Sequence, residues 1–124
     1  MATFSKLAFQ ATTMTTGTGL GVLVAATATA GTTIHTGANV ATTIDEIWLY
    51  AVNTSSASVK LTIEWGEATA PNGNIEVTVL PEAGLVTIIP GLLLQGNATP
   101  KVVKAFAGTT NVLVVHGFVN RITA

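Results

Sequence analysis

Short runs in which apolar and polar residues alternate make up much of this chain. The clearest run covers residues 59–65 (VKLTIEW), where Val59 and every second residue after it up to Trp65 are apolar. Because successive side chains of a β-strand point to opposite faces, this run predicts a strand with one face in the core and the other wet or against a polar partner. Residues 75–80 (IEVTVL) alternate in the same way, and the Pro-Asn-Gly turn signal at 71–73 favours pairing of the two strands.

Turn-forming residues divide the rest of the chain into further short segments with strand-like composition. Residues 43–52 also carry apolar residues at helical spacing, but their β-branched and aromatic content and their setting among strands favour a strand. Pro90-Gly91 predicts a break in the segment around it, and residues 107–110 are expected to connect the last two strands as a hairpin. We expect strands at 20–27, 33–36, 43–52, 59–65, 75–80, 85–89, 92–94, 101–106 and 111–119.

This pattern predicts an all-β protein of about eight or nine short strands with no helix. Two antiparallel sheets packed face to face, in a jelly-roll-like or Greek-key order, suit this strand number, so we expect an antiparallel β-sandwich over residues 20–124. Residues 1–19 are expected to form an N-terminal arm with Phe4, Leu7 and Phe9 as apolar anchors. The arm is either a frayed end or first edge strand, or a segment that docks on a neighbouring subunit.

Composition adds that the surface carries few charges. Charged residues make up 9% of the chain, against about 25% in ordinary domains, and the formal net charge is −1 at pH 7. A surface of Thr, Ser, Asn, Gly and Ala can be covered by a neighbour at low desolvation cost, which favours docking on other subunits. Among the basic residues only Lys101 and Lys104 lie close together, so nucleic-acid binding is not expected. The apolar stretches near 20–30 and 83–94 are too short and too interrupted for membrane spans.

Side chains suited to catalysis or metal binding are sparse. The chain has no cysteine and two histidines, His35 and His116, which we interpret as structural residues because no ligand spacing connects them. In the last strand both alternating halves are largely apolar, so either the half with His116 or the half with Val115 faces the core. Asp45 and Glu46 are neighbours on a strand and point to opposite faces, so they cannot form an acid/base pair. We therefore expect no catalytic residue, no cofactor, no metal and no enzyme activity.

Five further side chains admit a simple structural interpretation beside a functional one. Glu64 and Glu76 fall on polar strand faces and are expected to form solvated or interface ion pairs. The two tryptophans and Tyr50 could stack against a sugar ring, which would suit a carbohydrate-binding module. Trp65 alternates with core residues, however, and is expected in the core.

Several short motifs go beyond simple alternation. They are AATATAGTTIHT at 25–36, TIEWG at 62–66, APNGNIEV at 70–77, PEAGLV at 81–86, PGLLL at 90–94 and HGFVNRI at 116–122. With these motifs the chain resembles, over most of its length, small all-β proteins encoded in the head gene clusters of tailed phages and prophages.

The resemblance implies a structural virion protein, and in particular a capsid decoration (cement) protein that binds the outer shell at capsomer junctions and stabilises it. Its partners would be the major capsid protein and copies of itself, with a trimer as one arrangement. It would be made in the host cytoplasm and reside on the capsid surface of the virion. The family has no catalytic motif to carry over. Two alternatives stay open: a tail, neck or fibre-associated virion component, and a carbohydrate-binding β-sandwich module.

Overall fold

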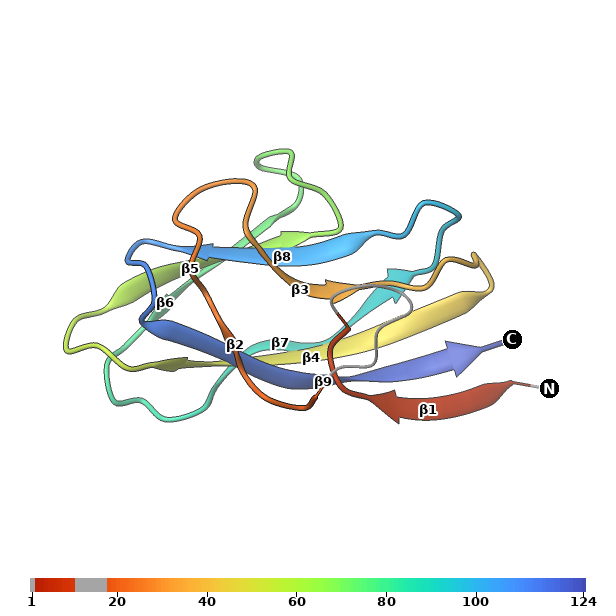
Figure 1. Ribbon diagram of the computed structural model, residues 1–124, viewed down its shortest axis with the longest axis horizontal. Helices are drawn as coiled ribbons and strands as arrows, with labels where there is room; N and C mark the ends of the chain where they lie inside the picture. Colours follow the sequence, from red (N-terminus) through yellow and green to blue (C-terminus); the bar gives the residue numbers. More distant parts are fainter. Residues whose placement is uncertain (1, 11–17) are drawn as a thin grey trace.

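The computed structural model describes residues 2–10 and 18–124, which form nine β-strands and no helix. The strands make two antiparallel sheets that pack face to face, as Figure 1 shows. Sheet A has the order β1-β9-β4-β7, with β2 also paired to β9, and sheet B has the order β3-β8-β5-β6. The strands are β1 (Thr3–Leu7), β2 (Val22–Leu23), β3 (Thr32–Thr36), β4 (Thr43–Asn53), β5 (Val59–Trp65), β6 (Asn74–Val79), β7 (Val86–Gln95), β8 (Val102–Ala107) and β9 (Leu113–Thr123).

The order of the strands in the two sheets is that of a jelly roll. From β2 onward, sheet A contains β2-β9-β4-β7 and sheet B contains β3-β8-β5-β6, which are two four-stranded layers with Greek-key connections. The predicted antiparallel β-sandwich is therefore confirmed, and its connectivity is the jelly-roll alternative. β1 is an addition to this plan, because it extends sheet A beside the end of β9.

The core lies between the sheets and follows the alternation of the central strands. In β4 every second residue is buried from Thr43 to Asn53, and Ile47 and Leu49 are fully covered. Leu61 and Ile63 of β5 cover them from sheet B and are also fully covered. The strand interpretation of the segment from residue 43 is thus confirmed against the helical one. β5 and β6 pair across the Pro71 turn as predicted.

One predicted break does not occur. β7 runs continuously from Val86 to Gln95, so the prediction of two strands separated at Pro90-Gly91 is wrong. β7 is an edge strand, where a proline without an N–H leaves no gap inside the sheet. The irregularity is absorbed by two shifts in the register between β4 and β7, and Gly91 adopts a positive φ of 82°.

Two further predictions about the connections are corrected. Residues 107–110 do not form a hairpin, because β8 belongs to sheet B and β9 to sheet A, so this loop crosses between the layers. β2 covers only Val22–Leu23, since the chain leaves sheet A at once: Val24 still bonds to the backbone of Leu113, but Ala26 already accepts from the backbone N–H of Ala107 in β8. A short strand that changes sheet is a normal feature of a sandwich corner.

The three apolar anchors predicted for the N-terminal arm differ in how far they are buried. Residues 3–7 form edge strand β1 on β9, as one of the two interpretations proposed, and Phe4 there stays 75% exposed. Leu7 is half-buried, whereas Phe9 belongs to the core with 8% exposure. Residues 11–17 of the arm lie outside the described residues. The segment before them is therefore part of the sandwich rather than a free tail.

Candidate functional site

A carboxylate, a guanidinium and an imidazole are buried together between β3, β4 and β9. Asp45 is completely covered, and Arg121 binds both of its oxygens, with Nε at 2.7 Å from Oδ1 and Nη2 at 2.9 Å from Oδ2. His35, also completely covered, lies with Nε2 at 2.8 Å from Asp45 Oδ2. Burial alone would raise the pKa of Asp45, but the bonds from Arg121 and then from His35 outweigh it and lower that pKa. Asp45 is therefore held as a carboxylate in the interior.

The histidine of this cluster also holds the N-terminal arm. The backbone N–H of Gln10 donates to His35 Nδ1 at 3.1 Å, so Nδ1 is the acceptor of the imidazole and Nε2 carries the hydrogen that points to Asp45. The backbone N–H of Thr36 in turn donates to Gln10 O at 2.7 Å, and the ring of Phe9 lies 6.4 Å from that of His35. His35 is thus a hydrogen-bonded structural residue, as the sequence predicted.

Glu64 is a second buried carboxylate, and it holds a loop. Its side chain is 1% exposed, Oε1 accepts from the backbone N–H of Gly31 at 2.6 Å, and Oε2 accepts from the Thr29 hydroxyl at 2.5 Å. The prediction of an ion pair for Glu64 is therefore wrong, since the loop before β3 folds over the polar face of β5. For Glu76 the ion pair is confirmed, with Lys60 Nζ 2.5 Å from its Oε2 at the surface.

The outward half of sheet A forms a broad surface of aromatic and aliphatic side chains. The β4–β9 register places Trp48 beside Phe118 and Tyr50 beside His116, so of the two halves left open for β9 the half with Val115 faces the core. Cross-strand neighbours share a face. We call this surface the outer face of sheet A; it consists of Phe4, Lys6, Ile44, Glu46, Trp48, Tyr50, Val52, Thr87, Pro90, Leu93, Gln95, Val114, His116, Phe118, Asn120 and Ile122.

Side-chain contacts hold the centre of this face in place. The rings of Trp48 and Phe118 lie nearly parallel, 11° apart with centroids at 6.0 Å, and Lys6 Nζ lies 4.6 Å from the centroid of Phe118. Glu46 Oε1 accepts from the indole Nε1 of Trp48 at 2.7 Å and from the side-chain amide of Asn120 at 3.0 Å. These two bonds lower the pKa of Glu46. The face is consequently preorganised before any partner arrives.

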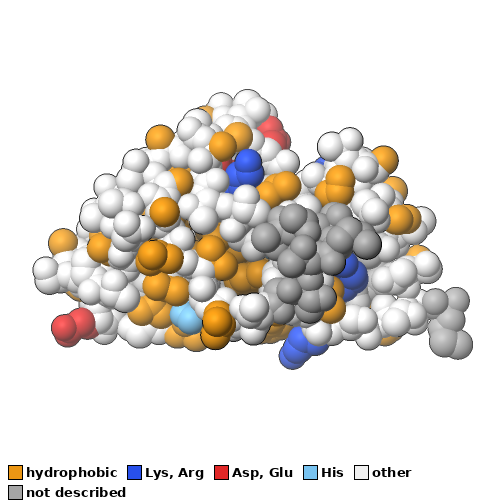
Figure 2. All heavy atoms as spheres, viewed as in Figure 1, with side chains coloured by type: hydrophobic (Ala, Val, Ile, Leu, Met, Phe, Trp, Pro, Cys, Tyr) orange, Lys and Arg blue, Asp and Glu red, His pale blue; other side chains and the backbone are white. Residues whose placement is uncertain are grey.

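Charge on this surface is sparse. The outer face of sheet A contains one lysine, Lys6, and one carboxylate, Glu46, and no arginine or aspartate. Glu46 already accepts two hydrogen bonds. An open hollow of 450 Å³ lies at its β1 end, lined by Phe4, Lys6, Glu46 and Asn120 among others. Figure 2 shows the same scarcity of charge on the side that Figure 1 faces: hydrophobic side chains are spread among uncharged ones, with few charged groups between them.

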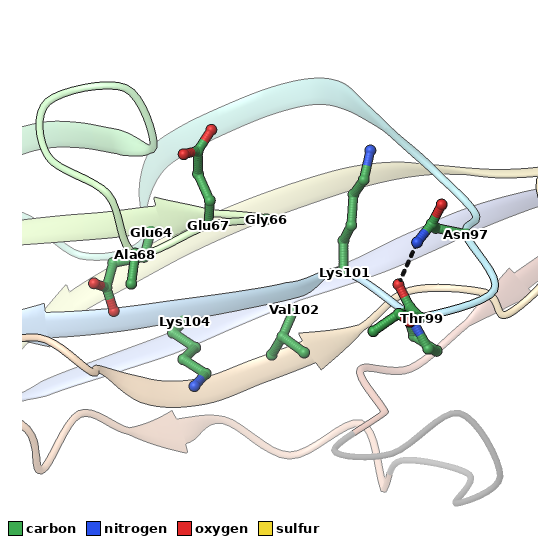
Figure 3. A pocket seen from close by; sticks show the side chains of 10 residues that line it. Glu64, Gly66, Glu67, Ala68, Asn97, Thr99, Lys101, Val102 and Lys104 are labelled. Atoms are coloured by element: carbon green, nitrogen blue, oxygen red, sulfur yellow. Dashed lines mark hydrogen bonds between the residues drawn. The ribbon is translucent and has the colours of Figure 1, made fainter.

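A second hollow of 310 Å³ lies in sheet B, between the end of β5 with the loop that follows it and the start of β8 with the loop that precedes it. Figure 3 shows this hollow. Its charged side chains do not converge: Lys101 and Glu67 project to one side and Lys104 to the other. Glu64 also lines it, but both carboxylate oxygens are already bonded to the loop before β3. This arrangement does not bring an acid, a base or a nucleophile to one point, and in the part of the chain that the structure describes no three potential metal ligands gather.

Trp65 is only partly in the core. It packs against the buried cluster but stays half-buried at the rim of an adjoining hollow of 400 Å³, together with Leu93 and Leu94. We therefore expect Trp65→Ala to cost less than the roughly 3–5 kcal/mol of a fully buried large aromatic. Urea unfolding measures this loss, with Leu61→Ala, a completely buried position, as the larger reference. A Trp65→Ala loss above that of Leu61→Ala would contradict the half-buried placement.

Sequence reasoning missed the two buried carboxylates. Asp45 and Arg121 are 76 positions apart, so only the register of β4 on β9, which brings them opposite each other, reveals the pair. Glu64 lies at a polar position of an alternating strand, and the residues next to it in the sequence do not indicate that a distant loop covers it. By contrast, the outward position of Trp48 and Tyr50 follows from the alternation of β4 once Ile47 and Leu49 are assigned to the core.

Comparison with models of known families, with curated proteins and with solved structures gives no significant match to this chain. Within the described residues, no helix is long and apolar enough to cross a bilayer. The function is therefore inferred from the surface just described and from the sequence motifs.

Proposed function

We propose that this chain is a structural virion protein of a tailed phage, a decoration (cement) protein that binds the outer shell of the capsid at capsomer junctions and stabilises it. It would act without catalysis, with the major capsid protein and copies of itself as partners, on the capsid surface after synthesis in the host cytoplasm. The sequence motifs at 62–66, 70–77, 81–86 and 116–122 point to this class. A rigid jelly roll with a preorganised, weakly charged face is a body suited to the task.

The observation that carries the proposal is the outer face of sheet A. It presents aromatic and aliphatic side chains across four strands, with one lysine, Lys6, and one carboxylate, Glu46, among them. Covering such a surface requires the desolvation of few charges, while aromatic residues supply much of the binding energy at protein interfaces. Many identical weak contacts on a symmetric shell would add up through multivalency. We assign this face to contact with the capsid.

Binding to particles that lack the protein tests this assignment. Phe4 and Leu93 lie at opposite edges of the face and are 75% and 53% exposed, so lysine at both positions should spare the fold. We expect the double variant Phe4→Lys/Leu93→Lys to bind at least about tenfold more weakly, because each new charge loses its water on docking. Val40→Lys is the matched control, since Val40 is 51% exposed but lies in the loop before β4. Equal binding by the double variant and the control would remove the face from the contact.

The position of the protein in the virion distinguishes the capsid decoration role from a tail, neck or fibre role. Electron cryomicroscopy of intact particles should place the chain on the outer shell, whereas density confined to the tail, neck or fibres would replace the decoration role with the second virion role. A gene position beside the major capsid gene would agree with the first outcome.

One observation favours the carbohydrate-binding alternative. Trp48 and Tyr50 both point outward on the same strand, and outward aromatic rings can stack on sugars. Glycan-array binding that is lost in Tyr50→Ala, together with unchanged binding of that variant to particles, would favour a sugar-binding module over a shell protein.

A further inference from the structure

The exposed edges of the two sheets differ in how well they are protected against pairing. β7 carries Pro90, a positive φ at Gly91 and two register shifts, and β3 has a register shift between Thr33 and His35. The backbone N–H of Thr36 at the end of β3 is also occupied by Gln10. Prolines, bulges, covering segments and charged side chains are features by which natural sheets prevent edge-to-edge association.

Among the described residues, β6 has no proline, bulge or covering segment, and its one charged side chain, Glu76, is paired with Lys60 of β5. It is an edge strand of six residues that contains neither proline nor glycine, and it pairs with β5 in unbroken register from Val59–Val79 to Glu64–Asn74. Ile75 and Val77 of β6 pack against the core yet remain partly exposed. β1, the other regular edge, is exposed from Thr3 to Lys6, and the half that faces the core carries Thr3 and Ser5 before Leu7, so it has less of the core to extend. A strand added beside β6 would therefore continue both the sheet and the core.

The ladder with β5 determines which backbone groups of β6 are free to pair. The backbone N–H of Trp65 donates to Gly73 O at 2.7 Å, and antiparallel ladders alternate between bonded and non-bonded pairs. Ile75, Val77 and Val79 consequently direct their N–H and C=O groups toward β5. The N–H and C=O groups of Glu76 and Thr78 point away from β5, to the open edge.

We propose that β6 pairs with β6 of a second copy about a two-fold axis, which joins the two B sheets into one eight-stranded sheet. A two-fold contact uses the same surface on both copies, so one open edge is sufficient. A closed trimer would instead need β6 to meet a different strand. This inference does not depend on the proposed virion role, because it uses only the edge of sheet B.

Charge selects the register of this pairing. Bonding of the free groups allows Glu76 to stand opposite Glu76, Glu76 opposite Thr78, or Thr78 opposite Thr78 of the second copy. The first places like charges face to face, which is destabilising, and the third shortens the paired segment and leaves Ile75 without a neighbour. The second pairs residues 75–79 fully, sets Val77 opposite Val77 on the axis, and leaves each Glu76 bonded to Lys60 of its own chain. The second copy is thus complementary in backbone hydrogen bonding, polarity and charge.

Cysteine cross-linking tests the register directly, because the chain has no cysteine of its own. Val77 faces its counterpart in a non-bonded antiparallel pair, where Cα atoms lie about 4.5 Å apart and a disulfide can form. Val77→Cys should therefore form a covalent dimer in a glutathione redox buffer. Thr78→Cys is the matched control, since its counterpart is displaced along the strand beyond the roughly 7 Å limit for a disulfide. No dimer of Val77→Cys, or equal cross-linking of both variants, would overturn the pairing.

A proline variant tests the same contact without a new thiol. Thr78→Pro removes an N–H that points to the open edge and leaves the β5 ladder intact, so the fold should unfold at the same urea concentration as Thr78→Ala. Sedimentation velocity should show a concentration-dependent dimer for the wild-type chain and for Thr78→Ala, and at least about tenfold weaker dimerisation for Thr78→Pro. A wild-type chain that stays monomeric at millimolar concentration, or forms a trimer, would refute the two-fold contact.

Discussion

Replacing Arg121 with methionine is expected to lower the free energy of unfolding by about 3–5 kcal/mol, because the change leaves a buried carboxylate without its cation. Asp45 has no exposed surface, and Arg121 binds both of its oxygens. Asp45 accepts three hydrogen bonds in the wild-type chain, two from Arg121 and one from His35, and in the variant it keeps only the one from His35. Urea unfolding at neutral pH measures the loss.

A surface ion pair provides the matched control for this variant. Lys60→Met also replaces a cation by methionine, but Lys60 and Glu76 are 58% and 51% exposed, and exposed pairs contribute only about 0–1 kcal/mol. The loss in Arg121→Met should therefore clearly exceed the loss in Lys60→Met. Equal losses would mean that water reaches Asp45 in the folded protein.

The dependence of the free energy of unfolding on acid pH tests the same cluster of Asp45, Arg121 and His35. The pKa of Asp45 is lowered in the folded protein, since the bonds from Arg121 and His35 outweigh the effect of burial. A carboxylate with a depressed folded pKa stabilises the fold above its unfolded pKa of about 3.9, and this stabilisation is lost as the pH falls through the folded value. The free energy of unfolding should accordingly fall more steeply with acid in the wild-type chain than in Arg121→Met.

The parts of the fold that alternate simply were predictable. β5 matches its predicted bounds, β4 extends one residue further than predicted, and β6 begins and ends one residue earlier. The hydrophobic pattern determines the register of these strands because each has a face in the core. β7 was divided wrongly at Pro90, since a proline signals a break only when a strand lies inside a sheet. Nothing local in residues 107–110 distinguishes a hairpin from a crossing between sheets.

The candidate site was less predictable, because it depends on strand neighbours that are distant in sequence. In β9 both alternating halves are largely apolar, and only the pairing with β4 shows that Phe118 and His116 face outward. That ambiguity has a physical meaning: in a two-layer sandwich only one face of each strand lies in the core, so one of the two apolar halves of β9 must stay outside it. The surplus half becomes the outer face of sheet A, which is where we place the contact with a partner.

Gly117→Ala is expected to destabilise the fold by about 3 kcal/mol or more, because the site combines overpacking with backbone strain. Gly117 lies in the centre of β9 opposite Leu49 and has a φ of +152°. A Cβ there would lie 1.9 Å from the carbonyl oxygen of Trp48 and 2.8 Å from the Phe9 ring. The methyl group must push apart the two central strands of sheet A or displace the arm residue that closes the core.

Two other glycines separate the causes of this loss. Gly108→Ala adds a methyl group whose nearest neighbours are 3.9 Å away at an ordinary φ, so its unfolding free energy should stay within about 0.5 kcal/mol of wild type. Gly19 has a φ of +79° with no atom within 4 Å, so Gly19→Ala isolates the cost of the backbone conformation. Gly117→Ala should cost more than Gly19→Ala, because it adds the close approach of β9 to β4 to an unfavourable φ. An excess near zero would mean that the two strands separate at Gly117 without loss of stability, and the rigid outer face built on them would lose its support.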